Sequence, residues 1–227
     1  MSEPTFTVFR SHKFECQTFS SNQRIAANVC PCCKTALAVA PDGRVYASWR
    51  QVLSGDFRHI AVSASIDEGK SFSRPVIVSD DRWMISGCPV SGTALNVGAN
   101  GELRVLWYTA GEAGAPGLYW SESTDGGRTF APRRTFINGQ VRGTPLLLPE
   151  GNNDFMTVWE NDDDGQARIA FAQHADDGCV SASITTADNA ELPSAAVTSD
   201  QLFVAYISKV NKRHEIWLAR AKVIAKS

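Results

Sequence analysis

The sequence of 227 residues predicts an all-β protein, a small β-propeller of four to five four-stranded blades. The first observation is an internal repeat, and its matched pairs are Cys30 and Cys88, Trp49 and Trp107, and Asp67 and Asp125. One register relates them all, since 88 − 30, 107 − 49 and 125 − 67 each give 58. A repeat of about 50 residues is typical of propellers and solenoids. The second observation is alternating apolar and polar residues between Gly-containing turns, which indicates short antiparallel strands.

The strands follow one another in the same order in each repeat. Alternation predicts strands at 36–40, 45–50, 59–65 and 75–79 in the first unit, and at 94–97, 103–109, 118–123 and 134–137 in the second. A third unit is visible at 145–148, 155–160 and 167–173, and a fourth at 194–198, 202–208 and 215–221. Sequential strands of this kind form the blades of a propeller.

The fourth unit lacks an outer strand, and residues 23–29 are the natural candidate to supply it. We therefore expect the N- and C-terminal strands to pair and close the ring, which removes exposed sheet edges. The alternative is an open partial propeller, whose free edges favour association with further copies of the chain. Residues 1–22 are expected to be an N-terminal extension or remnant blade, and residues 23–227 a single propeller domain.

Two turns share the pattern Ser-x-Asp-x-Gly-x-(Ser/Thr)-Phe. The matching residues are Ser65, Asp67, Gly69 and Phe72 in the first turn, and Ser123, Asp125, Gly127 and Phe130 in the second. The Asp side chain can accept backbone N–H groups of its own turn, Gly can adopt a positive φ, and the aromatic ring can pack into the sheet. We therefore interpret these residues as structural.

This pattern resembles the Asp-box, or BNR repeat, of the sialidase-like families, and the resemblance implies a β-propeller. It covers part of that fold, because complete sialidase-type propellers have six blades and a longer chain. Sialidases hold a carboxylate with an arginine cluster, and they use a Tyr–Glu pair and an Asp as catalytic groups. The residues of these types near the strand ends are Arg50, Arg58, Arg142, Tyr108, Glu160 and Asp56. The sialidase Arg-Ile-Pro signature is missing, and Arg24-Ile25-Ala26 is a poor substitute.

The resemblance leaves two functions open. The first is a non-catalytic binding or scaffold module that recognises a small molecule, a glycan or a protein on the face of the blade-to-blade crossovers. The second is a sialidase-like glycoside hydrolase that works through the residues named above.

The cysteines suggest a third function, which is compatible with either of these. Cys30, Cys32 and Cys33 lie in one crossover and Cys88 lies at the equivalent place one repeat later. Crossovers pass near the central axis, so the four thiols are expected to converge. They predict a soft-metal site for Cu or Zn, a disulfide such as one from Cys30 or Cys32 to Cys88, or buried free thiols.

The run Asp162-Asp163-Asp164 is either a calcium site or a solvated acidic turn. A net charge of −2 argues against nucleic-acid binding. We expect no membrane span, because no run of about 18 apolar residues occurs. The N-terminus has no signal-peptide pattern, so we expect a cytoplasmic protein as given, or a secreted one if a leader has been removed.

Overall fold

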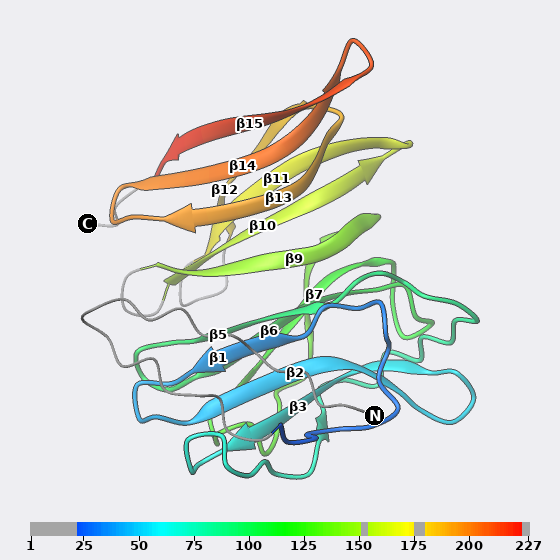
Figure 1. Cartoon of the computed structure of the whole chain (residues 1–227), viewed down its shortest axis with the longest axis vertical. Coiled ribbons are helices and arrows are strands. Elements are labelled where there is room, and N and C mark those ends of the chain that lie inside the picture. Colours follow the sequence, from blue (N-terminus) through cyan, green and yellow to red (C-terminus); the bar gives the residue numbers. More distant parts are fainter. Residues whose placement is uncertain (1–21, 151–153, 175–179, 224–227) are drawn as a thin grey trace, which may run out of the picture.

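The computed structural model describes residues 22–150, 154–174 and 180–223, and their regular structure is entirely β. The strands form four antiparallel sheets, and the strands within each sheet are consecutive in the chain (Figure 1). The all-β prediction is therefore confirmed. In these ranges no helix is long and apolar enough to cross a bilayer. Almost all of the expected extension at residues 1–22 lies outside the described residues.

The strands have the following bounds. The first sheet contains β1 (Ala36–Val39), β2 (Val45–Val52), β3 (Arg58–Ser65) and β4 (Val76–Ile77). The second contains β5 (Thr93–Val97), β6 (Leu103–Thr109), β7 (Gly117–Ser123) and β8 (Arg134–Asn138). The third contains β9 (Val141–Glu150), β10 (Asp154–Asp163), β11 (Gln166–His174) and β12 (Val180–Asp188). The fourth contains β13 (Ala190–Val197), β14 (Gln201–Val210) and β15 (Arg213–Lys222). Each strand predicted by alternation between residues 36 and 221 is present, and β12 is an addition, whereas residues 23–29 form no strand.

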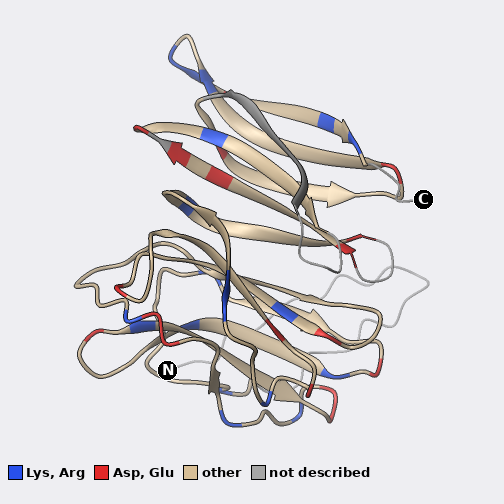
Figure 2. Ribbon diagram, turned by 180° about the vertical axis from the view of Figure 1, so that it is seen from behind, with Lys and Arg blue, Asp and Glu red and all other residues tan. Residues whose placement is uncertain are grey.

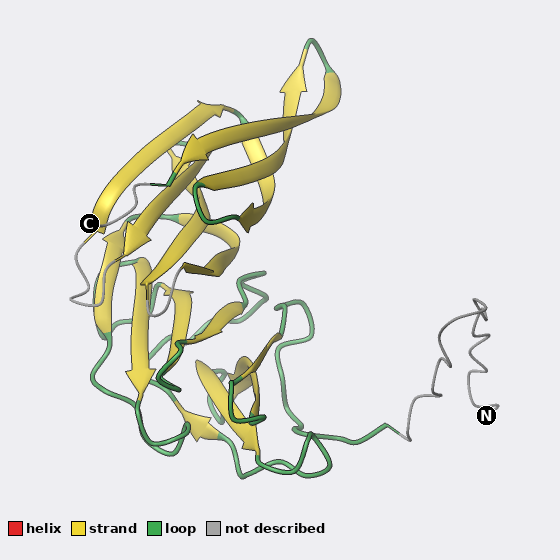
Figure 3. Cartoon of the chain, turned by 90° about the vertical axis from the view of Figure 1, so that its left-hand side faces the viewer, coloured by secondary structure: helices red, strands yellow, loops and turns green. Residues whose placement is uncertain are grey.

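The four sheets follow one another along the long axis of the molecule, on a curved path (Figures 1 and 3). The first strands of neighbouring sheets touch, because β5 contacts both β1 and β9, and β9 contacts β13. The first strand of each sheet therefore contacts the first strand of the next sheet, in addition to the packing between the faces of the two sheets. Residues far apart in the sequence meet where these first strands begin.

Three apolar clusters fill the spaces between the sheets. Their largest members are Tyr46, Ile60 and Trp107 between the first two sheets, Trp120, Phe155 and Trp159 between the second and third, and Met156, Ile169 and Tyr206 between the third and fourth. Burial of apolar surface stabilises a fold by about 25 cal/mol per Å². Trp107, Trp159 and Tyr206, which lie on the second strands of their sheets, thus pack between sheets.

The predicted pairing of the N- and C-terminal strands is wrong for the described residues. The segment 23–29 lies on the first sheet, where the side-chain amide of Gln51 donates to the carbonyl of Asn28 at 2.7 Å. Ile25 of the same segment packs with Trp49. The fourth sheet has three strands in the described part of the chain, and no sheet closes a ring there. Alternation along 23–29 could not reveal that Gln51 and Trp49 offer this segment a nearer partner.

Antiparallel strands place their connections alternately at two ends of the sheets. Segments 30–35 and 88–92, which lead into β1 and β5, define the crossover end. The turns 66–75 and 124–133, which follow β3 and β7, define the box end. Lys and Arg are interspersed with Asp and Glu at both ends of the sheets (Figure 2).

Candidate functional site

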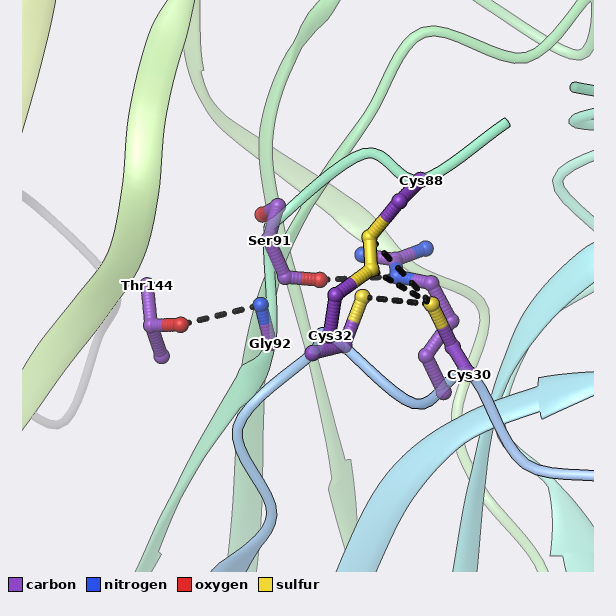
Figure 4. Close-up of a disulfide and its surroundings, with 8 residues drawn as sticks. Cys30, Cys32, Cys88, Ser91, Gly92 and Thr144 are labelled. Carbon is purple, nitrogen blue, oxygen red and sulfur yellow. Dashed lines mark hydrogen bonds between the residues drawn. A yellow bond between two sulfur atoms is a disulfide. The ribbon is translucent and has the colours of Figure 1, made fainter.

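Four cysteines meet at the crossover end. The Sγ atom of Cys30 lies 3.6 Å from that of Cys32, 2.9 Å from that of Cys33 and 4.0 Å from that of Cys88. Cys32 and Cys88 are joined as a disulfide, whereas Cys30 and Cys33 are buried free thiols. All four sulfur atoms lie within 4.8 Å of one another. The side chains of Cys30, Cys32 and Cys88 point toward a common centre (Figure 4).

Close backbone packing brings the crossovers together. The N–H of Cys30 donates to the carbonyl of Arg50 at 2.9 Å, which fixes the first crossover on β2. Gly92 of the second crossover lies so near that a Cβ atom there would be 2.4 Å from the carbonyl oxygen of Lys34. Its N–H donates to Oγ1 of Thr144 on β9 at 3.0 Å (Figure 4). Three sheets therefore contribute to one place, and only glycine fits at position 92 without a shift of the backbone.

Arg50 lies beneath the cysteines and is fully buried. Its guanidinium donates to the carbonyls of Ser91 and Tyr108, both at 2.8 Å, and more weakly to that of Arg58 at 3.4 Å. Burial lowers the pKa of Arg50, and the neighbouring Cys33 opposes this shift. The sequence resemblance predicts that Arg50 holds the carboxylate of a ligand. In the structure its N–H groups bind backbone carbonyls instead.

Asp56 lies in the neighbouring loop between β2 and β3, and Arg58 is the first residue of β3. Nη1 of Arg58 is 3.5 Å from Oδ1 of Asp56, and the Arg58 side chain is largely buried whereas the Asp56 side chain is exposed. The N–H of Arg58 donates to the carbonyl of Trp83 at 2.8 Å. These contacts tie the loop to the next crossover. Arg58 is thus paired with Asp56, whereas Arg142 is paired with Asp162, so these two arginines have different partners.

The proposed Tyr–Glu pair does not form a hydrogen bond among the described residues. The Tyr108 hydroxyl donates to Oε1 of Gln140 at 2.5 Å, and Glu160 accepts the N–H of Leu192 at 2.8 Å. Burial raises the pKa of both groups, and the charge of Asp162 adds to the shift at Tyr108. Gln140 lies in the turn before β9, and no motif in the sequence marks it as a partner of Tyr108.

Arg142 and Glu160 face each other across β9 and β10. Nε of Arg142 lies 2.9 Å from Oδ2 of Asp162, and the other oxygen of Asp162 accepts the N–H of Gly165 at 2.9 Å. This ion pair raises the pKa of Arg142 and lowers that of Asp162. Asp162, which the sequence offered as a calcium ligand, therefore has a cation and a backbone N–H as partners.

A pocket of about 180 Å³ opens beside the cysteines. It is lined by Cys32, Lys34, Val90, Arg142, Gly143, Thr144, Glu160, Leu192 and Pro193. The first, second, third and fourth sheets, or the crossovers into them, all contribute. A larger pocket of about 640 Å³ lies at the box end, against Phe72 and Arg128, away from the cysteines and from Tyr108 and Glu160.

The two box turns are held by their aspartates. Oδ1 of Asp67 accepts the Ser65 hydroxyl at 2.7 Å and the Ser71 N–H at 2.8 Å. These bonds lower the pKa of Asp67 to about 2, with the Ser71 hydroxyl as the largest cause. Asp125 makes the equivalent bonds to Ser123 and Thr129, and its pKa is also lowered. Glycine follows in each turn with a positive φ, 83° at Gly69 and 81° at Gly127. The rings of Phe72 and Phe130 pack against the apolar clusters.

No family model matches the sequence, and no curated protein matches it. Solved structures do resemble the fold. A protein of unknown function from Dyadobacter fermentans is 15% identical, with a TM-score of 0.61 over 83% of this chain and 52% of its own. The NanB sialidase of Streptococcus pneumoniae is 10% identical, with a TM-score of 0.56 over 88% of this chain and 53% of its own. Trypanosoma rangeli sialidase in complex with the inhibitor DANA is 12% identical, with a TM-score of 0.53 over 83% and 37%.

The chain spans about half or less of the length of these proteins. At such low identities the likeness concerns the fold alone. The fold is therefore sialidase-like, and residue roles must be argued from the contacts in this chain.

Proposed function

We propose that the chain is a non-catalytic binding module, a single domain whose sheets are consecutive propeller blades, and that its crossover-end pocket takes a small acidic molecule. The observation that carries this proposal is the lining of the pocket. Lys34 lies in the crossover that leads into β1 and Arg142 lies on β9, yet both border the same space of about 180 Å³. Two cations and one carboxylate, Glu160, line this small cavity, so the cations outnumber the anion and favour an anionic ligand.

Arg142 is well prepared for this role. Asp162 holds its Nε at 2.9 Å, which fixes the plane of the guanidinium. A planar guanidinium recognises a carboxylate through parallel N–H groups, and a fixed plane reduces the entropy lost on binding. The pocket is smaller than the ~300 Å³ lower bound usual for drug-sized ligands, so it suits one charged group and the atoms next to it.

The remaining contacts argue against turnover. A nucleophilic phenol needs an adjacent base, but the Tyr108 hydroxyl is bonded to Gln140 and Glu160 is bonded to Leu192. Arg50 directs its N–H groups at backbone carbonyls, so it is not available to a ligand in this arrangement. Binding without catalysis is the function that these contacts support.

A sialidase-like hydrolase is the second candidate. Glu160 and Arg142 border the same pocket, and the structural neighbours include sialidases. This candidate requires the Tyr108 hydroxyl to leave Gln140 and reach Glu160 when a ligand binds.

The test uses DANA, a carboxylate-bearing sugar analogue and the inhibitor bound in Trypanosoma rangeli sialidase, as the probe. Calorimetry on the whole chain should show binding that Arg142→Ala weakens by about tenfold, equivalent to about 1.4 kcal/mol. Arg128→Ala, which removes an exposed arginine at the box end, is the matched control and should bind as the unaltered chain does. A fluorogenic sialoside should not be hydrolysed.

Two results would overturn this assignment. One is the absence of DANA binding, or an equal loss in both variants, which would remove the ligand from the pocket. The other is hydrolysis of the sialoside that Tyr108→Phe abolishes, which would establish the second candidate.

A further inference from the structure

We propose that the four cysteines of the crossover end bind one zinc ion through four thiolates when Cys32 and Cys88 are reduced. This inference does not depend on the acidic ligand of the neighbouring pocket. It follows from the positions of the four sulfur atoms, from the spacing of the cysteines, and from the groups that surround them.

The sulfur atoms are close to the geometry that zinc requires. Zinc–sulfur bonds of about 2.3 Å in a tetrahedron place the sulfur atoms about 3.8 Å apart. Cys30 lies 3.6 Å from Cys32 and 4.0 Å from Cys88, on either side of this value. The 2.9 Å separation of Cys30 and Cys33 has to open by about 0.9 Å. Cys32 and Cys88 are bonded here, and after reduction their sulfur atoms have to separate from a bond length of about 2.0 Å by about 1.8 Å.

The size of the cluster limits the number of ions. All four sulfur atoms lie within 4.8 Å of one another, so one ion fits between them. An iron–sulfur cluster places several iron atoms between its cysteines and needs a wider set. Four sulfur ligands around a single centre favour tetrahedral zinc.

The sequence spacing supports the same ion. Cys30 and Cys33 form a Cys-x-x-Cys pair, a spacing that is common in zinc sites. The N–H of Cys33 turns back to the carbonyl of Cys30 at 3.5 Å, so both thiols leave one tight turn on the same side. Cys88 arrives from the equivalent crossover of the next repeat and completes the set with Cys32.

The surroundings suit a negatively charged metal centre. Zinc with four thiolates carries a net charge of −2, and an uncompensated charge of this size is costly when buried. The buried guanidinium of Arg50 lies next to Cys33 and supplies one positive charge, which offsets half of this charge. The backbone N–H of Ser91 also donates to the sulfur of Cys33. Hydrogen bonds of this kind orient the ligands of a metal and tune its affinity.

The disulfide in the structure is the oxidised form of the same set. Two electrons and two protons convert the Cys32–Cys88 bond to two thiols, and a dithiol reductant supplies both while it becomes a cyclic disulfide. Zinc then replaces the protons of the four thiols, and up to four protons pass to solvent. Zinc binding therefore requires the reduced protein.

The test starts from the whole chain, reduced with a dithiol and freed of excess reagent under nitrogen. Elemental analysis after zinc addition and dialysis should give one zinc ion per chain. Cobalt in place of zinc should give the intense thiolate charge-transfer absorption of a tetrahedral sulfur site. Cys30→Ser and Cys33→Ser should each weaken zinc binding at least about tenfold. Cys16→Ser and Cys179→Ser, which alter the two remaining cysteines, should leave it unchanged.

A second measurement needs no variant and so does not depend on whether a serine variant folds. The reduced chain is alkylated with and without zinc, and the modified cysteines are mapped by mass spectrometry. Zinc should protect Cys30, Cys32, Cys33 and Cys88 from alkylation. Equal labelling with and without zinc, less than one ion per chain in the reduced protein, or loss of binding in the Cys16 and Cys179 variants would overturn the proposal.

Discussion

The sulfur atoms of Cys30 and Cys88, which occupy equivalent positions 58 residues apart, lie 4.0 Å from each other. A second pair of equivalents also touches, because Nη2 of Arg50 donates to the carbonyl of Tyr108 at 2.8 Å. The sequence repeat thus becomes direct contact between neighbouring sheets. The crossover end is the place where repeated positions meet, which is why chemistry can be assembled there from distant segments.

Gly92→Ala should disrupt the meeting of the crossovers. The added Cβ would lie 2.4 Å from the backbone of Lys34, so the crossovers must move apart. Overpacking of this kind costs about 1–3 kcal/mol of the free energy of unfolding. Urea denaturation should show this loss, and zinc binding should weaken. The adjacent Ser91→Ala, which removes a buried hydroxyl with no hydrogen-bond partner in the described residues, should change neither. If Gly92→Ala were as stable as the unaltered chain, the close approach of Gly92 to the backbone of Lys34 would be contradicted.

Asp81 should be a main support of the second sheet. It is fully buried, accepts Nε1–H of Trp107 at 2.7 Å and forms an ion pair with Arg133. Asp81→Asn leaves the cation of Arg133 without its counter-charge, and breaking a buried pair typically costs about 3–5 kcal/mol. Trp107→Phe breaks only the first bond and reduces ring volume, so a smaller loss in chemical denaturation is expected. An equal or smaller loss for Asp81→Asn would show that the ion pair contributes little.

Much of this fold could be predicted from the sequence, for a physical reason. Alternation reports which face of a strand is buried, so β6 at 103–109 was bounded correctly and β2 and β3 within two residues. Alternation does not predict the contacts that single side chains make. Gln51 draws the segment 23–29 onto the first sheet, and Gln140 takes the hydroxyl of Tyr108.

The candidate site was predictable to the same limited degree. The expected convergence of the four cysteines is present, because equal repeat positions place both crossovers at one end of the sheets. The catalytic grouping rested on residue types alone, and residue type does not report where a side chain points. Arg50 illustrates this, since a guanidinium suited to a carboxylate ligand instead binds backbone carbonyls inside the protein.

The stabilising effect of Asp67 should disappear in acid. Its pKa is lowered from 3.8 to about 2 by bonds to Ser71 and Ser65, so the charged form is favoured in the folded state. This contribution is complete above the unfolded value of 3.8 and is lost as the pH falls through about 2. Asp67→Asn should therefore lower the melting temperature at pH 7 and have a much smaller effect near pH 2. A difference that stays constant with pH would contradict this role.

Glu160 should have the opposite pH dependence. Burial raises its pKa above the ordinary 4.5, so the folded state favours the neutral acid. Its ionisation then reduces stability as the pH rises above 4.5, relative to a residue that cannot ionise. Glu160→Gln should gain stability over the unaltered chain between about pH 4 and pH 7, measured by thermal unfolding. If Glu160→Gln instead became less stable than the unaltered chain between these pH values, the folded state would favour the charged form of Glu160.

The outer face of the fourth sheet should mediate association between copies of the chain. Register places Phe203, Ile216 and Leu218 on the face that points away from the third sheet, and no sheet covers it in the described structure. Ile216 is 83% exposed, and Ile66 in a box turn is 84% exposed. Light scattering should show self-association that Ile216→Lys reduces and the matched Ile66→Lys does not. A monomer at all concentrations, or equal effects of both changes, would contradict this use of the face.

X-ray absorption at the zinc edge, on reduced and zinc-loaded protein, is the measurement closest to the proposal that distant crossovers assemble one site. The account predicts a first shell of four sulfur atoms at about 2.3 Å from the metal. A shell made mainly of nitrogen and oxygen, or one with fewer than four sulfur atoms, would show that Cys88 and the 30–33 turn do not share a single ion.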